Sequence, residues 1–438
     1  MFPWRLFAIL VFLLLVLSAG WFFLAGRGEV VIQGNEQVAP EQNIKKQLAG
    51  LETLEKESGV VKPEPVPIKK LNQDLEYQPQ LINPPEVVKA IYATGWSAGS
   101  TSRINALIKL IDETELNAIV VDVKDYSGFI SYEIDPVRDN EGAQRASISN
   151  GAGNSVFEGV GAFDELRIIK PNELIKKLHD KNIYVIARIS VFQDTILAKA
   201  HPEWAVKSSS TGMTWKDRKG LAWMDPASRE VWDYNLEIAK DALARGFDEV
   251  NFDYIRFPSD GNLEDAVYPF WDDVAPRSLV IENFFRFLRE NLKDEKISAD
   301  LFGLTTIASD DLGIGQVLEK AAPYFDFIAP MVYPSHFANG TFGYKNPANN
   351  PYEIIEASIE SAVRKLVKYS SSQGTSTVGV EIKTVAKIRP WLQDFDLGAD
   401  YDAQKVRAQI DASDKSGGVG WMIWDPKNIY TRGALNAE

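Results

Sequence analysis

The chain has 438 residues, of which 45% are hydrophobic and 25% are charged, a composition typical of a folded protein rather than a disordered or collagen-like one. Its net charge of −14 argues against a general nucleic-acid binder, which needs a basic surface. Because the chain has no cysteine, disulfides, a thiolate nucleophile and thiolate-bound metals are excluded. With only His179, His201 and His336, the sequence also argues against a three-histidine metal site.

The N-terminus carries an apolar segment. Residues 6–25 contain no charge and have about the length, roughly 20 residues, that crosses a bilayer as a helix. Arg5 and the α-amino group precede this segment, while Arg27 after it is followed by Glu29; this charge bias favours a cytoplasmic N-terminus, with the rest of the chain outside. The alternative is a cleaved signal peptide with its cut near residues 18–20, which would make the protein secreted. The apolar run continues beyond that point to Leu24 and favours an uncleaved anchor.

The composition divides the chain into three parts. We expect a membrane anchor over 1–27, a partly disordered extracytoplasmic linker over 28–85, and one large domain over 86–438. The linker contains the proline-rich run 62–67, which favours extended polyproline-like backbone. Prolines 84 and 85 mark its end.

Beyond residue 86, short apolar runs alternate with amphipathic stretches. The predicted strands are 88–94, 118–124, 183–192, 249–257, 297–302, 327–333, 387–393 and 418–424. The predicted helices are 102–114, 171–180, 228–245, 277–292, 315–322, 352–369 and 403–413. Eight β segments in such an alternation predict an α/β fold, a (β/α)₈ TIM barrel. A doubly wound open sheet is the alternative, but residues 94–99 after the first strand do not form its GxGxxG phosphate loop.

Strand parity predicts which side chains face the inside of the barrel, since they alternate between the two faces. In 249–256, Val250 and Phe252 suit the helix-facing side, which turns Asn251 and Asp253 inward. The other inward residues lie mostly in the last half of their strands, near the end where barrel active sites are built. They are Asp122, Lys124, Arg188, Asp300, Met331, Tyr333, Arg389, Trp391, Gln393, Met422 and Trp424.

Asp253 is the leading candidate for a functional carboxylate. An inward carboxylate between apolar neighbours is costly unless it is paired or used, and Arg256 follows it closely. Asp122 and Asp300 are candidates on similar grounds. His336, after the sixth strand, is expected either to line the site or to be a solvated loop residue.

Other polar residues are expected to serve the fold. Glu249 lies early in its strand, where a buried ion pair with Arg188 or Arg389 is the simplest expectation. Asp125, Asp225 and Asp425 are expected to begin turns or cap helices, and His179 and His201 are expected to be structural.

The loops at the predicted C-terminal end are long and aromatic. The loop 131–166 is expected to be a flap or an insertion. The later loops contain Trp204, Trp215, Trp223, Tyr268, Phe270, Trp271, Phe337, Phe342 and Tyr344. Aromatic rings near carboxylates are typical of a carbohydrate site, because apolar sugar faces stack on rings while hydroxyls bond to polar groups. Walker, GxSxG and HExxH motifs are missing from the sequence.

Several longer motifs carry a family resemblance. They are residues 117–125 (NAIVVDVKD), 201–205 (HPEWA), 223–226 (WMDP), 246–258 (GFDEVNFDYIRFP), 329–336 (APMVYPSH) and 389–395 (RPWLQDF). From about residue 86 to 430 the chain closely resembles a bacterial family of glycoside-hydrolase-like TIM barrels, distantly related to the α-amylase barrels. The resemblance implies a carbohydrate substrate.

The resemblance also implies roles. Asp253 resembles the nucleophile of amylase-type barrels, and Asp300 occupies the place of their acid/base, which is normally a glutamate. The inward Met331 and Tyr333 and the Trp424 of the eighth strand also resemble residues of chitinase-like barrels. The chitinase motif DxxDxDxE is missing from the fourth strand. The seventh strand ends in Gln393 and Asp394, where many glycosidase barrels have a glutamate nucleophile.

Our first hypothesis is therefore a membrane-anchored, extracytoplasmic glycoside hydrolase. Asp253 would be its nucleophile or base and Asp300 its general acid. The residues expected to bind the sugar are Asp122, Lys124, Arg188, Asn251, Arg256, Tyr333, His336, Trp391, Gln393 and Trp424. Sequence leaves the choice between retention and inversion open.

Two other hypotheses stay open. The first is a catalytically inactive barrel that binds cell-wall or surface glycan, which the missing glutamates on strands five and seven favour. The second adds Ca²⁺ held by carboxylates such as Asp122 and Asp125. We expect no other cofactor and no nucleic-acid partner.

Overall fold

The computed structural model describes residues 74–134, 156–157, 159–373 and 385–437. The predicted membrane anchor, most of the predicted linker and most of the 131–166 loop lie outside these residues. Within the described part, none of the helices has the length and apolar character that a membrane crossing requires.

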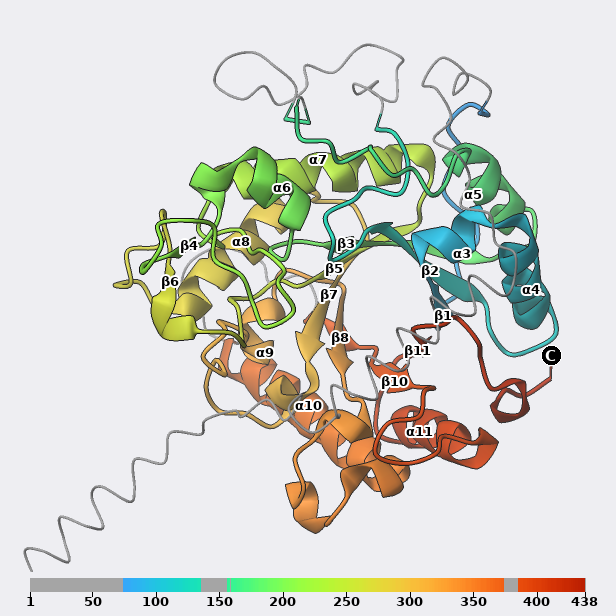
Figure 1. The fold of residues 1–438 in the computed structure, drawn as a ribbon. Coiled ribbons are helices and arrows are strands. Elements are labelled where there is room, and N and C mark those ends of the chain that lie inside the picture. Colours follow the sequence, from blue (N-terminus) through green and yellow to red (C-terminus); the bar gives the residue numbers. More distant parts are fainter. Residues whose placement is uncertain (1–73, 135–155, 158, 374–384, 438) are drawn as a thin grey trace, which may run out of the picture. The chain divides into compact units, whose positions relative to one another are not determined.

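The described strands of the main sheet are parallel and close into a barrel (Figure 1). Going around it, they are β1 (Lys89–Ala93), β2 (Ala118–Lys124), β3 (Tyr184–Ser190), β5 (Glu249–Asp253), β7 (Ile297–Phe302), β8 (Phe327–Met331), β9 (Lys387–Ile388) with β10 (Trp391–Gln393), and β11 (Trp421–Trp424). β11 pairs with β1, and Trp391 of β10 pairs with Met331 of β8, which closes the ring. Counting β9 and β10 as one interrupted strand, the predicted eight-stranded TIM barrel is confirmed.

The interruption in the seventh strand has a simple cause. Pro390 lies between β9 and β10 and has no N–H to donate to a neighbouring strand. Arg389 still donates its backbone N–H to the carbonyl of Ile328, and Met422 donates to the carbonyl of Pro390. The strand therefore keeps its place in the barrel across the break.

Helices connect the strands close to the predicted ranges. They are α3 (Gly95–Gly99), α4 (Thr101–Asp112), α5 (Pro171–His179), α6 (Thr195–Ala200), α7 (Arg229–Arg245), α8 (Arg277–Asn291), α9 (Leu318–Ala321), α10 (Pro351–Gln373) and α11 (Ala403–Lys415). In α7 the Ser228 hydroxyl caps the N–H of Val231, and the helix ends at Gly246 with φ 107°. A two-stranded ribbon, β4 (Lys207–Ser208) with β6 (Ala266–Val267), joins the loops that follow β3 and β5.

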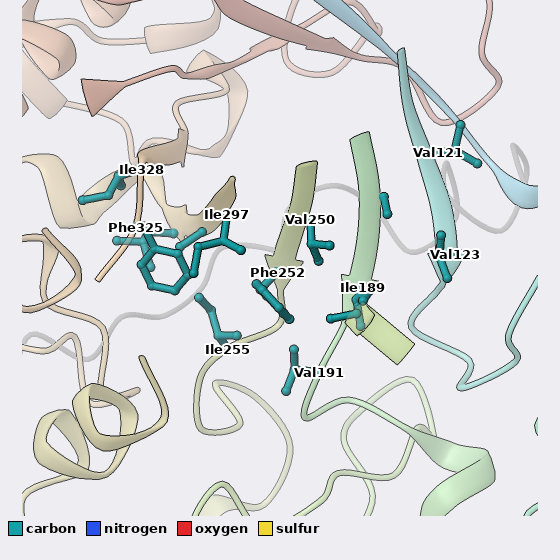
Figure 2. Packing of buried hydrophobic residues seen from close by; sticks show 14 of the residues in the cluster. Val121, Val123, Ile189, Val191, Val250, Phe252, Ile255, Ile297, Phe325 and Ile328 are labelled. Carbon is teal, nitrogen blue, oxygen red and sulfur yellow. The ribbon is translucent and has the colours of Figure 1, made fainter. Parts of the chain in front are cut away.

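Two apolar clusters confirm the predicted parity of most strand residues. Ile119, Val121, Val250 and Phe252 belong to the larger cluster between strands and helices. Figure 2 shows part of it, with Val121, Val250 and Phe252 among the labelled side chains. The alternate residues, such as Val120, belong to a smaller cluster inside the barrel.

Lys124 is an exception, and its predicted inward orientation is wrong. The pairing of β2 with β3 shifts register between Asp122 and Lys124, which is the mark of a β-bulge. The Lys124 ammonium instead lies 2.8 Å from Asp194 Oδ2 and 2.7 Å from Oδ1 of Asn235 on α7, fully buried. One extra residue in the strand thus moved this side chain to the helix side.

The end of the predicted linker is packed against the barrel. The N–H of Gln78 donates to the carbonyl of Arg245 at 3.2 Å, and the N–H of Leu81 donates to Oδ1 of Asp248 at 2.6 Å. The Asp74 carboxylate accepts the N–H groups of Asn172 and Glu173 at the start of α5. Leu81 also packs against the cluster inside the barrel, so this segment contributes to the barrel core.

Candidate active site

Arg188, on β3, is the centre of the polar group at the C-terminal end of the strands. Its Nη1 donates to Oδ1 of Asp122 at 2.6 Å, and its Nη2 donates to Oδ2 of Asp253. Its Nε lies 3.6 Å from Oδ2 of Asp300. The four residues come from the consecutive strands β2, β3, β5 and β7, so neighbouring strands bring them together. One guanidinium therefore faces three carboxyl groups.

The electrostatics of Arg188 follow from these neighbours. Burial alone lowers the pKa of Arg188, but Asp122 and Asp253 raise it well above its ordinary value. Burial raises the pKa of Asp122, and Arg188 offsets part of that rise. Tyr92, on β1, donates its hydroxyl to the second oxygen of Asp122 and places its ring 5.6 Å from the guanidinium. The charged group is thus enclosed between strands β1 and β7.

Asp300 has an unusual set of partners. Its Oδ1 accepts Nδ2–H of Asn251 at 2.8 Å and the indole N–H of Trp391 at 2.7 Å. Its Oδ2 has no hydrogen-bond partner among the described residues. Burial, reinforced by the negative charge of Asp253, raises the pKa of Asp300 to about 8. This rise favours the protonated form of Asp300 near neutral pH; both donors lie on Oδ1, and Oδ2 faces Nε of Arg188 at 3.6 Å.

Asp253 is the last residue of β5 and accepts hydrogen bonds on both oxygens. Besides Arg188 on Oδ2, the backbone N–H of Tyr254 donates to Oδ1 at 2.5 Å. Its side chain is buried, with about 5% of the residue exposed. Arg256, a little further along, places its guanidinium 4.6 Å from the rings of both Trp223 and Phe302.

Beneath this group lies the ion pair expected for Glu249. Arg389 Nη1 donates to Oε2 of Glu249 at 3.1 Å, and Nη2 donates to Oε1. Both side chains are fully buried. Ser298 donates its hydroxyl to Oε1 of Glu249 and accepts Nδ2–H of Asn251 at 3.0 Å. The structural interpretation of Glu249 is confirmed, with Arg389 as its partner.

The opposite half of the barrel end is aromatic. Tyr333 and Trp424 are stacked with ring centroids 5.6 Å apart, and Phe395 meets Trp424 edge-on at 5.1 Å. His336 meets Tyr333 edge-on at 5.3 Å. Tyr92 lies 6.3 Å from Trp424 and links this half to Asp122. A polar ligand with an apolar face, such as a sugar ring, could meet both halves at once.

His336 lies on the loop after β8 and is exposed, with protein packed on one side of its ring. Removal of water from its charged form lowers the pKa of His336 to about 4, and the positive charge of Lys219 adds to this effect. Its Nδ1 lies 3.1 Å from the Ser335 hydroxyl. The ring of His336 contacts Tyr333 of the aromatic half while the residue is exposed, and its contact with a ligand stays a prediction.

Gln393 is buried, and both polar atoms of its side chain make hydrogen bonds to the backbone. Its Oε1 accepts the N–H of Ser335 at 3.2 Å, and its Nε2 donates to the carbonyl of Phe395 at 2.8 Å. Its two polar atoms join the loops after the sixth and seventh strands. Gln393 thus holds the loops that carry His336 and Phe395, and its contact with a sugar stays a prediction.

The residues expected to be structural have that role. Asp225 accepts the N–H groups of Ala227 and Phe270, and Asp425 accepts those of Lys427 and Ile429. Asp125 accepts the N–H of Ser127. The two remaining histidines pair with nearby acids, His179 with Asp248 at 3.0 Å and His201 with Glu203 at 3.0 Å.

The Ca²⁺ hypothesis finds no support in the described residues, where no group of three or more His, Asp or Glu side chains could hold a metal ion. Asp122 is bound by Arg188 and Tyr92, and Asp125 is paired with Arg167. Each carboxylate therefore already has a cationic partner.

Two site residues were missed from the sequence. Tyr92 has the same parity as Ala90, so the alternation in β1 could have identified it as inward-facing. Phe395 lies beyond the end of β10, where parity no longer applies. Its only signal was its position beside the Gln393–Asp394 pair in a recognised motif.

Comparisons with known proteins agree with this architecture. A family model described as "Putative glycosyl hydrolase domain" matches residues 90–430. A hypothetical protein from Ruminiclostridium thermocellum is 34% identical over 51% of this chain and 98% of its own, with a TM-score of 0.40. The glycoside hydrolase domain of PgaB (BpsB) from Bordetella bronchiseptica is 14% identical over 80% of this chain and 99% of its own, with a TM-score of 0.53, which shows a shared fold. A comparison with curated proteins gave no match.

The family model covers most of the chain and all of the barrel strands except the first residue of β1, including the strands that bear Asp122, Arg188, Asp253 and Asp300. The chain therefore belongs to the family described as a "Putative glycosyl hydrolase domain" and folds as a TIM barrel.

Proposed function

We propose that the protein is a glycoside hydrolase that uses Asp253 as nucleophile or base and Asp300 as general acid. The observation that carries this assignment is the contrast between two neighbouring carboxyl groups. Asp300 has a pKa of about 8, whereas Asp253 accepts hydrogen bonds on both of its oxygens, as a carboxylate does. Glycoside hydrolysis needs such a pair, one group protonated and one ionised, at the same pH.

The arrangement around the pair suits a sugar. The charged half of the barrel end offers Asp122 and Arg188 to hydroxyl groups, and the aromatic half offers Trp424 to an apolar ring face. Trp424 and Phe395 are both partly exposed, while Tyr333, which contacts both rings, is buried. A pyranose stacked on Trp424 would direct its edge towards strands β2 to β7.

The experiment is reducing-end release by the full-length protein from a panel of peptidoglycan, amino-sugar polymers and α- and β-glucans. Asp253→Asn and Asp300→Asn are run beside it, with Asp425→Asn as a control for a buried carboxylate that only caps a turn. Release that is lost in the first two variants and kept in the third supports the assignment. Release that survives Asp253→Asn contradicts it.

A binding-only barrel is the second candidate function. The observation that favours it is burial, because Asp300 is only 1% exposed and its Oδ2 is shielded from solvent. A general acid has to reach the glycosidic oxygen. Saturable glycan binding without release, unchanged in both Asp253→Asn and Asp300→Asn, would establish this reading instead.

We further propose that the barrel lies outside the cytoplasm, held by an uncleaved helix over residues 6–25. The support is the uncharged apolar run and the charge bias around it, since these residues lie outside the described part. Protease treatment of intact cells should digest the barrel and leave a membrane-associated N-terminal fragment. Release of an intact barrel without that fragment would indicate a cleaved signal peptide.

A further inference from the structure

Tyr254, the residue directly after Asp253, has an uncommon backbone conformation. Its φ is 52°, in the left-handed region that side chains other than glycine, asparagine and aspartate rarely adopt. The described residues include five other non-glycine positions with positive φ: Asn182, Asp273, Leu312, Phe342 and Asn428. None of these five directly follows one of the two proposed catalytic carboxylates, whereas Tyr254 does.

The left-handed turn brings a donor to the carboxylate. The N–H of Tyr254 donates to Oδ1 of Asp253 at 2.5 Å, while Arg188 holds Oδ2 from β3. Each oxygen of Asp253 thus has its own donor, one from a side chain and one from the backbone. With both oxygens held, the carboxylate plane cannot rotate freely about its Cβ–Cγ bond.

Neighbouring groups hold Tyr254 in this conformation. Its carbonyl accepts the N–H of Phe192 at 3.2 Å, and the carbonyl of Asp253 accepts the N–H of Val191 at 2.9 Å. Its ring lies 6.1 Å from the ring of Trp223 and 5.6 Å from the Arg256 guanidinium. Strain of this kind persists only where the surrounding structure fixes it, and it concentrates at functional sites.

We propose that Tyr254 is a positioning residue whose left-handed backbone, rather than its ring, orients the Asp253 carboxylate for catalysis. The inference rests on the proposed function, since it assigns a role in the same reaction. It goes beyond that function because it assigns the orientation of a catalytic carboxylate to the backbone conformation of the next residue. A displaced carboxylate costs turnover rather than affinity, because misplacement of about 1 Å can lower rates on the order of 100-fold.

The test compares two substitutions in the full-length protein. Tyr254→Asn keeps access to the left-handed region and removes the ring, whereas Tyr254→Val excludes that region because valine is β-branched. With the substrate found in the panel, Tyr254→Asn should keep kcat within about threefold, and Tyr254→Val should lower kcat roughly 100-fold at nearly unchanged KM. Equal losses in both variants would assign the role to the ring and overturn the proposal, as would full activity in Tyr254→Val.

Asn182→Val is the matched control for folding. Asn182 has φ 55° but lies in the turn between α5 and β3, remote from the carboxyl groups. It should lower the melting temperature as Tyr254→Val does and leave kcat unchanged. A fall in kcat in this control comparable to that in Tyr254→Val would mean that loss of stability explains both, and would overturn the proposal.

A second readout does not depend on a substrate. The carboxyl ¹³C resonance of Asp253 reports its hydrogen bonds, and we expect it to shift in Tyr254→Val and not in Tyr254→Asn. This result would stand even if the panel shows no hydrolysis, so a failure of the hydrolase assignment is distinguishable from a failure of the positioning claim. An unchanged resonance in folded Tyr254→Val would overturn the positioning claim alone.

Discussion

The indole N–H of Trp391 donates to Oδ1 of Asp300 at 2.7 Å, across the inside of the barrel from β10 to β7. This bond and the one from Asn251 both fall on Oδ1, whereas Oδ2 has no hydrogen-bond partner among the described residues. The bond from Trp391 also connects the charged half of the barrel end with the aromatic half, because Trp391 lies 6.4 Å from Tyr92. The pKa of Asp300 therefore depends on side chains from three strands, and each side chain can be substituted separately. They are Arg188 on β3, Asn251 and Asp253 on β5, and Trp391 on β10.

Trp391→Phe should raise the pKa of Asp300 above its value of about 8, because the indole N–H favours the ionised form. It should also cost about 1 kcal/mol of unfolding free energy for the lost hydrogen bond, in addition to the cost of the smaller ring. The control is Trp421→Phe, since Trp421 is equally buried and its indole N–H has no partner in the described structure. Carboxyl ¹³C titration of both variants measures the shift, and equal pKa values for Asp300 would contradict the expectation.

Stability should fall as the pH rises from about 4 to about 8. Asp300 has an ordinary pKa near 3.8 in the unfolded chain and about 8 when folded, so the folded state binds its proton more tightly. The contribution is therefore fully present below pH 4 and is lost as the pH rises to about 8, to an extent on the order of a few kcal/mol. Urea unfolding between pH 5 and 8 should show this slope, and Asp300→Asn should flatten it. A slope equal in both proteins would show that other groups cause it.

Arg188→Gln should be strongly destabilising at pH 8. Removing the guanidinium leaves Asp122 and Asp253 buried without their cation, and breaking a buried ion pair costs about 3–5 kcal/mol. Adding Asp253→Asn to this variant should recover part of the loss, because it removes one of the unpaired charges. Denaturant unfolding of the single and double variants measures this, and a double variant less stable than Arg188→Gln would argue against the charge explanation.

The segment 74–85 should be needed for full stability. Its contacts include the Asp74 carboxylate at the start of α5, the Leu81 side chain in the barrel and the Gln80 amide on the carbonyl of Phe247 at 3.0 Å. A fragment beginning at residue 86 should therefore unfold at lower temperature than one beginning at 74, by about 2–4 kcal/mol in free energy. Equal melting temperatures would mean that the segment acts only as a linker.

Most of the barrel could be predicted from sequence because its signals are local. Apolar runs such as 118–124 and helix boundaries such as Ser228 and Gly246 act through near neighbours in the chain. Parity along β5 then placed Asp253 inside the barrel. Parity also turned Glu249 inward early in its strand and predicted a buried ion pair with Arg188 or Arg389, of which the structure shows Arg389.

The remaining features depend on contacts that a single strand does not encode. The bulge in β2 follows from the pairing with β3 and moves Lys124 to the helix side. The role of Gln393 comes from a loop 58 residues away in sequence, and the left-handed backbone of Tyr254 opposes the ordinary preference of that residue. Segment 74–85 looked like linker because its partners, including Arg245 and Asp248, lie far along the chain.

The central claim is that Asp253 and Asp300 act as an ionised and a protonated carboxyl group in one reaction. The most direct measurement is kcat/KM against pH for the full-length protein on the substrate found in the panel, since this ratio reports the pKa values of the free enzyme. We expect activity to fall above pH 8 as Asp300 loses its proton, and Asp300→Asn to lose both the activity and this limb. Activity that persists unchanged to pH 10, or in Asp300→Asn, would contradict the account.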